Sequence, residues 1–225
     1  MVDQTPLGLP NDVDVASNGV IYFSDASTKF TANELGGPYR AFQLDLLEHG
    51  GHGRLLAFYP DSGEARTLLE GIHFANGVAV GHDQTYVLVV ETELFRILRY
   101  WVEGPKKGQS ETFSESLPAY PDNLSRGSDG RCWVAMPAPR SKLLEDLADK
   151  PFARKLILRM PSFLHPKPIP YSHIIAIDEG GQVVEDMQDP DATYPTITSV
   201  TETERFLYLG NKKIRALGRK SKSDL

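Results

Sequence analysis

The sequence predicts an all-β fold of the propeller type, with residues 1–225 forming a single β-propeller domain. Four segments of the chain align with one another without a gap, and each one has the pattern of two short strands joined by a tight turn. Further strand-like runs lie between the segments. A unit of antiparallel hairpins that recurs along the chain is typical of propeller blades. We therefore expect about four blades.

The aligned segments share turn chemistry and strand chemistry at fixed offsets. The turns contain Asn18-Gly19 in the first segment and Asp129-Gly130 in the third, and such pairs supply the positive φ angles that two-residue hairpins require. Each turn is followed by an apolar run rich in β-branched and aromatic residues, which is typical of a buried strand. The aligned segments are 10–27, 75–92, 121–138 and 196–213.

The stretches between the segments predict a further hairpin and two departures from the repeat. The hairpin is expected around Glu179-Gly180-Gly181. Residues 28–53 contain clustered glycines and are expected to be loop-like. Residues 141–160 carry leucines at helical spacing, so they predict a helical insertion with Ser141 as its N-cap and Pro151 as a breaker.

The composition of the chain argues against several classes of protein. A formal net charge of −6 disfavours a nucleic-acid partner, because binding to phosphates requires a basic face. No apolar run approaches the roughly 18 residues of a membrane span, and the first ten residues lack the features of a signal peptide. Cys132 is the single cysteine, so no intramolecular disulfide is expected, and its apolar strand context favours a buried thiol. The compartment stays undetermined.

The second position of the aligned segments holds a column of oxygen donors. It is occupied by Asn11, Asn76 and Asp122 in the first three segments and by Ile197 in the fourth. Because the first strand of each blade lies nearest the propeller axis, equivalent positions can converge there. Amide and carboxylate oxygens suit calcium better than zinc or copper. The histidines share no such period, so the sequence predicts no transition-metal site.

The same residues carry a resemblance to a known family. NDVDVASNGVIYFSDAST, FANGVAV and LPAYPDNLSRGSDGRCWVAM resemble the strictosidine synthase-like branch of the gluconolactonase and paraoxonase superfamily, whose members are six-bladed propellers. Downstream, LADKPFARKLIL and QDPDATYPTITSVTETERFLYLGN look most like adipocyte plasma membrane-associated protein and its bacterial relatives. The resemblance covers nearly the whole chain and implies that it corresponds roughly to blades three to six.

The resemblance also implies roles for individual residues. In the metal-dependent lactonases and phosphotriesterases of the superfamily, the positions that match Asn11, Asn76 and Asp122 bind calcium, and the aspartate is the candidate general base or nucleophile. Their fourth ligand, a glutamate in the first blade, has no counterpart here, so calcium binding is expected to be weakened. Strictosidine synthases use a glutamate in the last blade, at the position of Thr198. Threonine is not a base near neutral pH, which disfavours that condensation reaction.

The sequence therefore favours a calcium-dependent hydrolase of lactones or aryl esters, or of phosphotriesters, with Asp122 as the catalytic residue. His73, Asn123 and Thr198 are expected to line the pocket. The missing glutamate keeps a second class open, a non-catalytic propeller that binds a small molecule or protein, or an inactive fragment. A strictosidine synthase-type condensing enzyme ranks third. The exposed strand edges of an incomplete propeller favour self-association.

Overall fold

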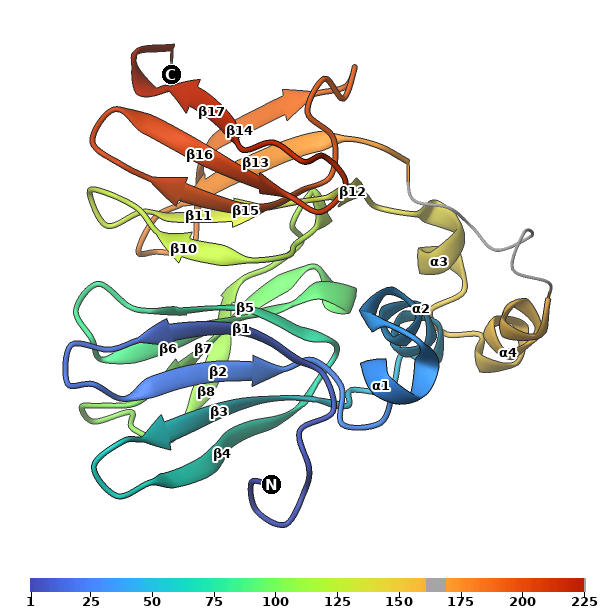
Figure 1. Cartoon of the computed structure of the whole chain (residues 1–225), viewed down its shortest axis with the longest axis horizontal. Coiled ribbons are helices and arrows are strands. Elements are labelled where there is room, and N and C mark those ends of the chain that lie inside the picture. Colours follow the sequence, from blue (N-terminus) through green and yellow to red (C-terminus); the bar gives the residue numbers. More distant parts are fainter. Residues whose placement is uncertain (161–168, 225) are drawn as a thin grey trace.

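The computed structural model describes residues 1–160 and 169–224, and its strands gather mainly in four antiparallel sheets (Figure 1). Within each of these sheets the strands follow one another in chain order, as in a propeller blade. The prediction of an all-β, partial propeller of about four blades is confirmed.

The strands of the first two blades are β1 (Pro10–Val15), β2 (Ile21–Asp25), β3 (Gly53–Tyr59), β4 (Glu64–Ile72), β5 (Ala75–Val80), β6 (Tyr86–Glu91), β7 (Arg96–Trp101) and β8 (Ser110–Ser114). Those of the other two are β10 (Leu124–Arg126), β11 (Cys132–Ala135), β13 (Ser172–Ile177), β14 (Val183–Asp189), β15 (Ile197–Glu202), β16 (Phe206–Asn211) and β17 (Gly218–Ser221). A short pair outside the blades joins β9 (Ala119–Tyr120) to β12 (Ala138–Pro139).

The four aligned segments each contain the first two strands of one blade, as the repeat predicted. The inner strands β1, β5, β10 and β15 pack against one another in that order, so the repeated positions face a common interior. The hairpin predicted around residues 179–181 joins β13 to β14.

The core lies between the blades, because each blade stacks its faces on its neighbours. Strand β6 shows this with period two: Val87 and Val89 pack toward the first blade, whereas Leu88 and Val90 pack toward the third. All six residues of β6 are buried, since the strand has a blade on either side. A continuous apolar run is the sequence pattern expected of such a strand.

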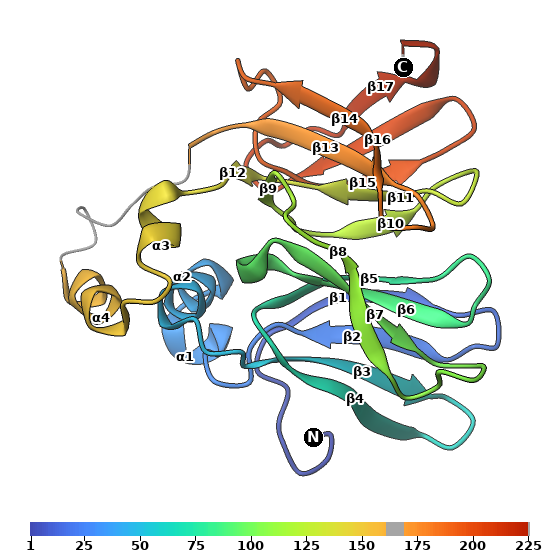
Figure 2. The ribbon, with the colours of Figure 1, turned by 180° about the vertical axis from the view of Figure 1, so that it is seen from behind.

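The helices leave the blades and gather at one end of the molecule, as Figures 1 and 2 show. They are α1 (Ala32–Leu35), α2 (Pro38–Glu48), α3 (Lys142–Asp146) and α4 (Pro151–Arg159). The predicted helical insertion at 141–160 is confirmed as α3 and α4. The Ser141 hydroxyl caps α3 by accepting a hydrogen bond from Leu144 N, and Pro151 begins the second helix rather than only ending the first.

The prediction that residues 28–53 are loop-like is wrong, because they contain α1 and α2. Two of their glycines lie at helix ends: Gly36 caps α1 in the left-handed conformation and Gly37 precedes α2. Helix α2 is also stabilised by burying Ala41 and Leu47, a tertiary contribution that local composition does not reveal.

Two expectations from composition can be compared with the structure. Cys132 is buried and unpaired, and burial raises the pKa of its thiol to about 12, which fits a structural role. Among the described residues, no helix is both long enough and apolar enough to cross a membrane.

Candidate functional site

Two of the aligned polar residues lie at irregularities in the inner strands. The register of β1 against β2 shifts within residues 10–13, around Asn11. The register of β5 against β6 shifts in the same way within residues 75–78, around Asn76. Such shifts mark β-bulges, which re-aim side chains and are common beside active sites.

The structure brings Asn76 and Asp122 together. Asn76 is buried, and its Nδ2 donates to Thr92 Oγ1 at 3.2 Å, while that hydroxyl donates to the Pro121 carbonyl at 2.9 Å. The Asn76 side chain also hydrogen-bonds to the Asp122 carboxylate. The two backbones meet as well, since Gly77 N donates to the Asp122 carbonyl oxygen at 3.2 Å.

Gly77 permits this close approach of β5 to the start of β10. A Cβ atom at this position would lie 2.4 Å from Leu124 N and 2.7 Å from Asn123 Cα, closer than such atoms can approach. The Asn-Gly pair that would predict a turn in isolation therefore lies inside a strand, and its glycine serves contact between blades.

Two side-chain amide oxygens at this junction are buried and accept no hydrogen bond from the described residues. Among the described residues, neither Asn76 Oδ1 nor Asn123 Oδ1 has a hydrogen-bond partner. Asn123 is held in place by its other side-chain atom, because Nδ2 donates to the Thr198 carbonyl at 2.8 Å. Buried polar atoms are almost always hydrogen-bonded, so both oxygens are available to a ligand or to water.

The environment of Asp122 alters its acidity. Burial, the largest cause, raises the pKa of the Asp122 carboxyl to about 6, and the nearby Asp12 charge acts in the same direction. The Lys212 ammonium and the hydrogen bond from Asn76 oppose this shift. Asp122 is therefore still mostly ionised at neutral pH, with a proton affinity well above that of an ordinary aspartate.

Asn11 differs from the other two members of the predicted set. It is exposed at the start of β1, whereas its neighbour Asp12 faces the adjacent blade and accepts a hydrogen bond from Val78 N at 2.9 Å. Burial is the main reason why the pKa of Asp12 is raised. Asp12, which sequence reasoning missed, is thus the β1 residue whose charge acts on Asp122; the only sequence signal for it was its place beside Asn11.

The predicted pocket residues divide between two regions. Thr198 contributes its backbone, since its carbonyl accepts from both Asn123 N at 3.2 Å and Asn123 Nδ2 at 2.8 Å. His73 is half-buried and its imidazole lies against Glu93. Asn123 lines a channel of about 600 Å³ between the inner strands. Polar residues of the other inner strands on this channel include Asp12, Asp14, Ser199 and Thr201.

Comparison with known proteins agrees with this architecture. The profile of the Strictosidine synthase family matches residues 11–105. STRICTOSIDINE SYNTHASE-LIKE 10 of Arabidopsis thaliana is 34% identical over 221 residues, which cover 95% of this chain and 57% of that protein. Adipocyte plasma membrane-associated protein of Gallus gallus is 33% identical over 222 residues, covering 94% and 51% respectively. The chain thus spans about half the length of these relatives.

Solved structures share the fold at much lower identity. A gluconolactonase from Xanthomonas campestris superposes with a TM-score of 0.60 at 16% identity, covering 94% of this chain and 57% of that one. Regucalcin from Agrobacterium tumefaciens, described as a calcium-binding protein, gives a TM-score of 0.56 at 13% identity, with 92% and 54% covered. On its sequence relatives, the chain belongs with the strictosidine synthase-like proteins, and its likeness to the gluconolactonase and regucalcin structures is one of fold.

Proposed function

We propose that this chain binds calcium through Asn76, Asp122 and Asn123, joined by Asn11 from the equivalent position of β1, and hydrolyses lactones or aryl esters at that site. Phosphotriesters belong to the same proposal, because their phosphoryl oxygen requires the same electrophile. The observation that carries it is the pair of buried, unpartnered amide oxygens beside the half-buried Asp122 carboxylate. Hard oxygen donors of this kind are those that calcium prefers.

The donor set also predicts how strongly the ion would bind. Asp122 contributes one formal negative charge and the asparagines contribute none, whereas calcium collects six to eight oxygens. Asn11 is exposed, so it contributes less to the site than the other members of the set. Water would complete the coordination, and we expect a weaker site than one with several carboxylates.

The residues around the site suit a hydrolytic step. Bound calcium would supply a Lewis acid for a carbonyl or phosphoryl oxygen. Asp122 would accept a proton from the attacking water, or attack directly, and a pKa near 6 places its basicity close to what neutral pH requires. The Asn76 amide orients the carboxylate through its hydrogen bond.

Two similar proteins support this proposal by their own descriptions. One is a gluconolactonase, which acts on a lactone, and the other is a calcium-binding protein. A condensing reaction of the strictosidine synthase type stays disfavoured, because Thr198 supplies no base and its carbonyl is occupied by Asn123.

The test combines calcium titration calorimetry with hydrolysis assays on a γ-lactone and an aryl acetate. Asp122→Asn should weaken calcium binding on the order of 100-fold by removing the only formal charge of the set, and should abolish hydrolysis. Asp61→Asn, in an exposed turn, is the matched control and should leave both measurements unchanged.

The two readouts separate the alternatives. Calcium binding that depends on Asp122, without turnover of either substrate, would replace the hydrolase by a non-catalytic binding protein. A folded chain without calcium affinity, or with affinity equal in both variants, would overturn the proposed site.

A further inference from the structure

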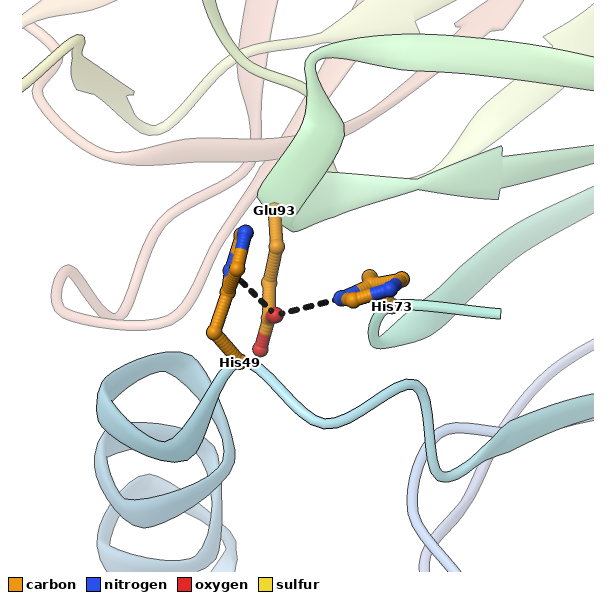
Figure 3. Close-up of side chains that lie close together, drawn as sticks. All are labelled: His49, His73 and Glu93. Atoms are coloured by element: carbon orange, nitrogen blue, oxygen red, sulfur yellow. Dashed lines mark ion pairs between the residues drawn. The ribbon is translucent and has the colours of Figure 1, made fainter. Parts of the chain in front are cut away.

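A second cluster of ligating side chains lies apart from the oxygen set, and it is built from residues that share no repeat position. His49 Nδ1 lies 3.1 Å from Glu93 Oε2, and His73 Nδ1 lies 3.4 Å from the same oxygen (Figure 3). One ligand atom from each residue falls within 4.8 Å of the other two. Two histidines that share no repeat period thus meet at one carboxylate, which the spacing in the sequence did not predict.

Three separate elements deliver these side chains. His49 is the C-cap of α2 and adopts the left-handed conformation with φ 58°, which turns it away from the helix axis. His73 lies in the connection between β4 and β5, and Glu93 lies in the 3₁₀ turn η1 (Thr92–Leu94) after β6. A backbone hydrogen bond from Glu93 N to the His73 carbonyl, at 3.3 Å, joins two of these elements.

Glu93 is a buried carboxylate whose described partners are the imidazoles of His49 and His73, both on Oε2. Its side chain is 0% exposed, and within the described part of the chain its Oε1 has no hydrogen-bond partner. Removing a carboxylate from water costs several kcal/mol unless partners replace the lost solvation. Three ligating atoms that converge in this way match the donor set of a bound cation, with Glu93 Oε1 still unpartnered.

A second buried carboxylate adds negative charge nearby. Asp45 lies one turn before His49 in α2, and its side chain is 0% exposed. Its Oδ1 accepts from Ser27 Oγ at 2.8 Å and lies 3.0 Å from His52 Nδ1, while Oδ2 has no partner among the described residues. Asp45 and Glu93 repel each other. A divalent cation would offset this repulsion.

We propose that His49, His73 and Glu93 bind a divalent transition-metal ion of the zinc class. Zinc bonds of about 2.0–2.2 Å at tetrahedral angles separate neighbouring ligand atoms by roughly 3.3–3.5 Å, close to the two His–Glu distances observed. Two imidazoles and one carboxylate leave a fourth position for water or another ligand. Nitrogen donors distinguish this site from the all-oxygen set at Asn76.

The site would tie the insertion to the blades. His49 belongs to the helical insertion, whereas His73 and Glu93 flank the first two strands of the second blade. Two adjacent residues of η1 belong to the two proposed sites. Thr92 accepts a hydrogen bond from Asn76 of the calcium site, and Glu93 is a ligand of the zinc site. A bound ion would therefore stabilise the segment that positions the calcium ligand, in addition to fixing α2.

The experiment uses the full, tag-free chain after dialysis against a chelator, with zinc titration calorimetry and the visible absorption of bound cobalt(II) as readouts. We expect one ion per chain. His73→Gln and Glu93→Gln should each weaken zinc binding by more than about 100-fold, since even outer-shell partners of a metal are worth 10–100-fold. His49→Asn should do the same, and asparagine tolerates the left-handed backbone of that position.

His82→Gln is the matched control, because His82 is half-buried and its Nε2 lies 2.9 Å from the Arg131 carbonyl oxygen, away from the cluster. It should retain zinc affinity and the cobalt spectrum. Circular dichroism confirms that each variant is folded, and Glu93→Gln preserves side-chain shape if a histidine variant does not fold. The proposal would be overturned if the folded wild-type chain bound no zinc. It would also be overturned if the Glu93→Gln and His73→Gln variants bound zinc as tightly as the His82→Gln control. Neither outcome depends on calcium or on hydrolysis.

Discussion

Two buried carboxylates of this protein have opposite surroundings. Asp25, at the end of β2, accepts hydrogen bonds from Gly8 N, from Leu9 N at 2.7 Å, and from Arg54 Nε and Nη2 at 3.1 and 3.0 Å. Glu93 is equally buried, yet its described partners are two imidazoles on Oε2, and its Oε1 has none.

We attribute this difference to function. The Asp25 carboxylate stabilises the fold, whereas the Glu93 carboxylate belongs to the proposed metal site. A carboxylate that stabilises the fold is saturated with donors, because each donor offsets part of the cost of removing it from water. Glu93, Asn76 Oδ1 and Asn123 Oδ1 are not saturated, and they lie among groups that bind cations well. Asp25 and Glu93 thus differ in how many donors surround them and not in burial.

The largest effect is expected at the saturated carboxylate. Asp25→Ala should lower the free energy of unfolding by about 3–5 kcal/mol, since it leaves Arg54 buried without a counter-charge. Urea denaturation followed by circular dichroism measures this. The double variant Asp25→Ala, Arg54→Met should recover much of the loss, and a double variant as unstable as the single one would show that the ion pair is not the cause.

The next largest effect is expected at the junction of β5 and β10. Gly77→Ala should cost about 3 kcal/mol, because its Cβ would lie 2.4 Å from backbone atom Leu124 N, and the separated strands should also weaken calcium binding. Thermal unfolding and calcium titration measure the two losses. Gly180→Ala is the control, since its Cβ would meet only the Asp178 side chain in an exposed hairpin. Equal stability of the two variants would contradict the close packing of the blades.

A third effect should depend on pH and comes from another saturated carboxylate, Glu202. Burial alone would raise its pKa, but hydrogen bonds from Lys222, Ser128 and Trp133 outweigh burial and lower the pKa of Glu202 to about 2. This stabilisation, about 2 kcal/mol, is fully present above pH 4.5 and is lost as the pH falls toward 2.

Glu202→Gln tests this pH dependence by chemical denaturation across the acidic range. The variant should be less stable than the wild type at pH 6, and the difference should shrink as the pH falls below 4.5. A difference that stays constant with pH would show that packing rather than ionisation is responsible.

The smallest effect is expected at the unsaturated carboxylate. Glu93→Gln should change the stability of the chelator-treated protein by less than about 1 kcal/mol, because removing the charge also removes its unmet solvation cost. Denaturation with and without zinc measures this. Zinc should stabilise the wild type and not the variant; a large loss of stability without metal would place Glu93 in the same class as Asp25.

Much of the fold could be predicted from the sequence. Turn pairs such as Asp129-Gly130 and runs such as that of β6 act locally, so their spacing indicates strands, hairpins and repeat without knowledge of the fold. The column of Asn76 and Asp122 could also be found, because equivalent positions of a repeat lie at equivalent places. Helix α2 could not, since its glycine-rich flanks suggest a loop and its stability comes from burial.

The sequence by itself determined the blades and the chemistry of the residues on their inner strands, because period and residue type are local properties. Only the tertiary structure decided that the Asp12 charge acts on Asp122, since the packing of β1 and β10 on β5 brings the inner strands together. It alone decided that His49, His73 and Glu93 converge, because an inserted helix and two connections follow no repeat. Their meeting depends on how the elements pack, and no spacing in the sequence records that packing.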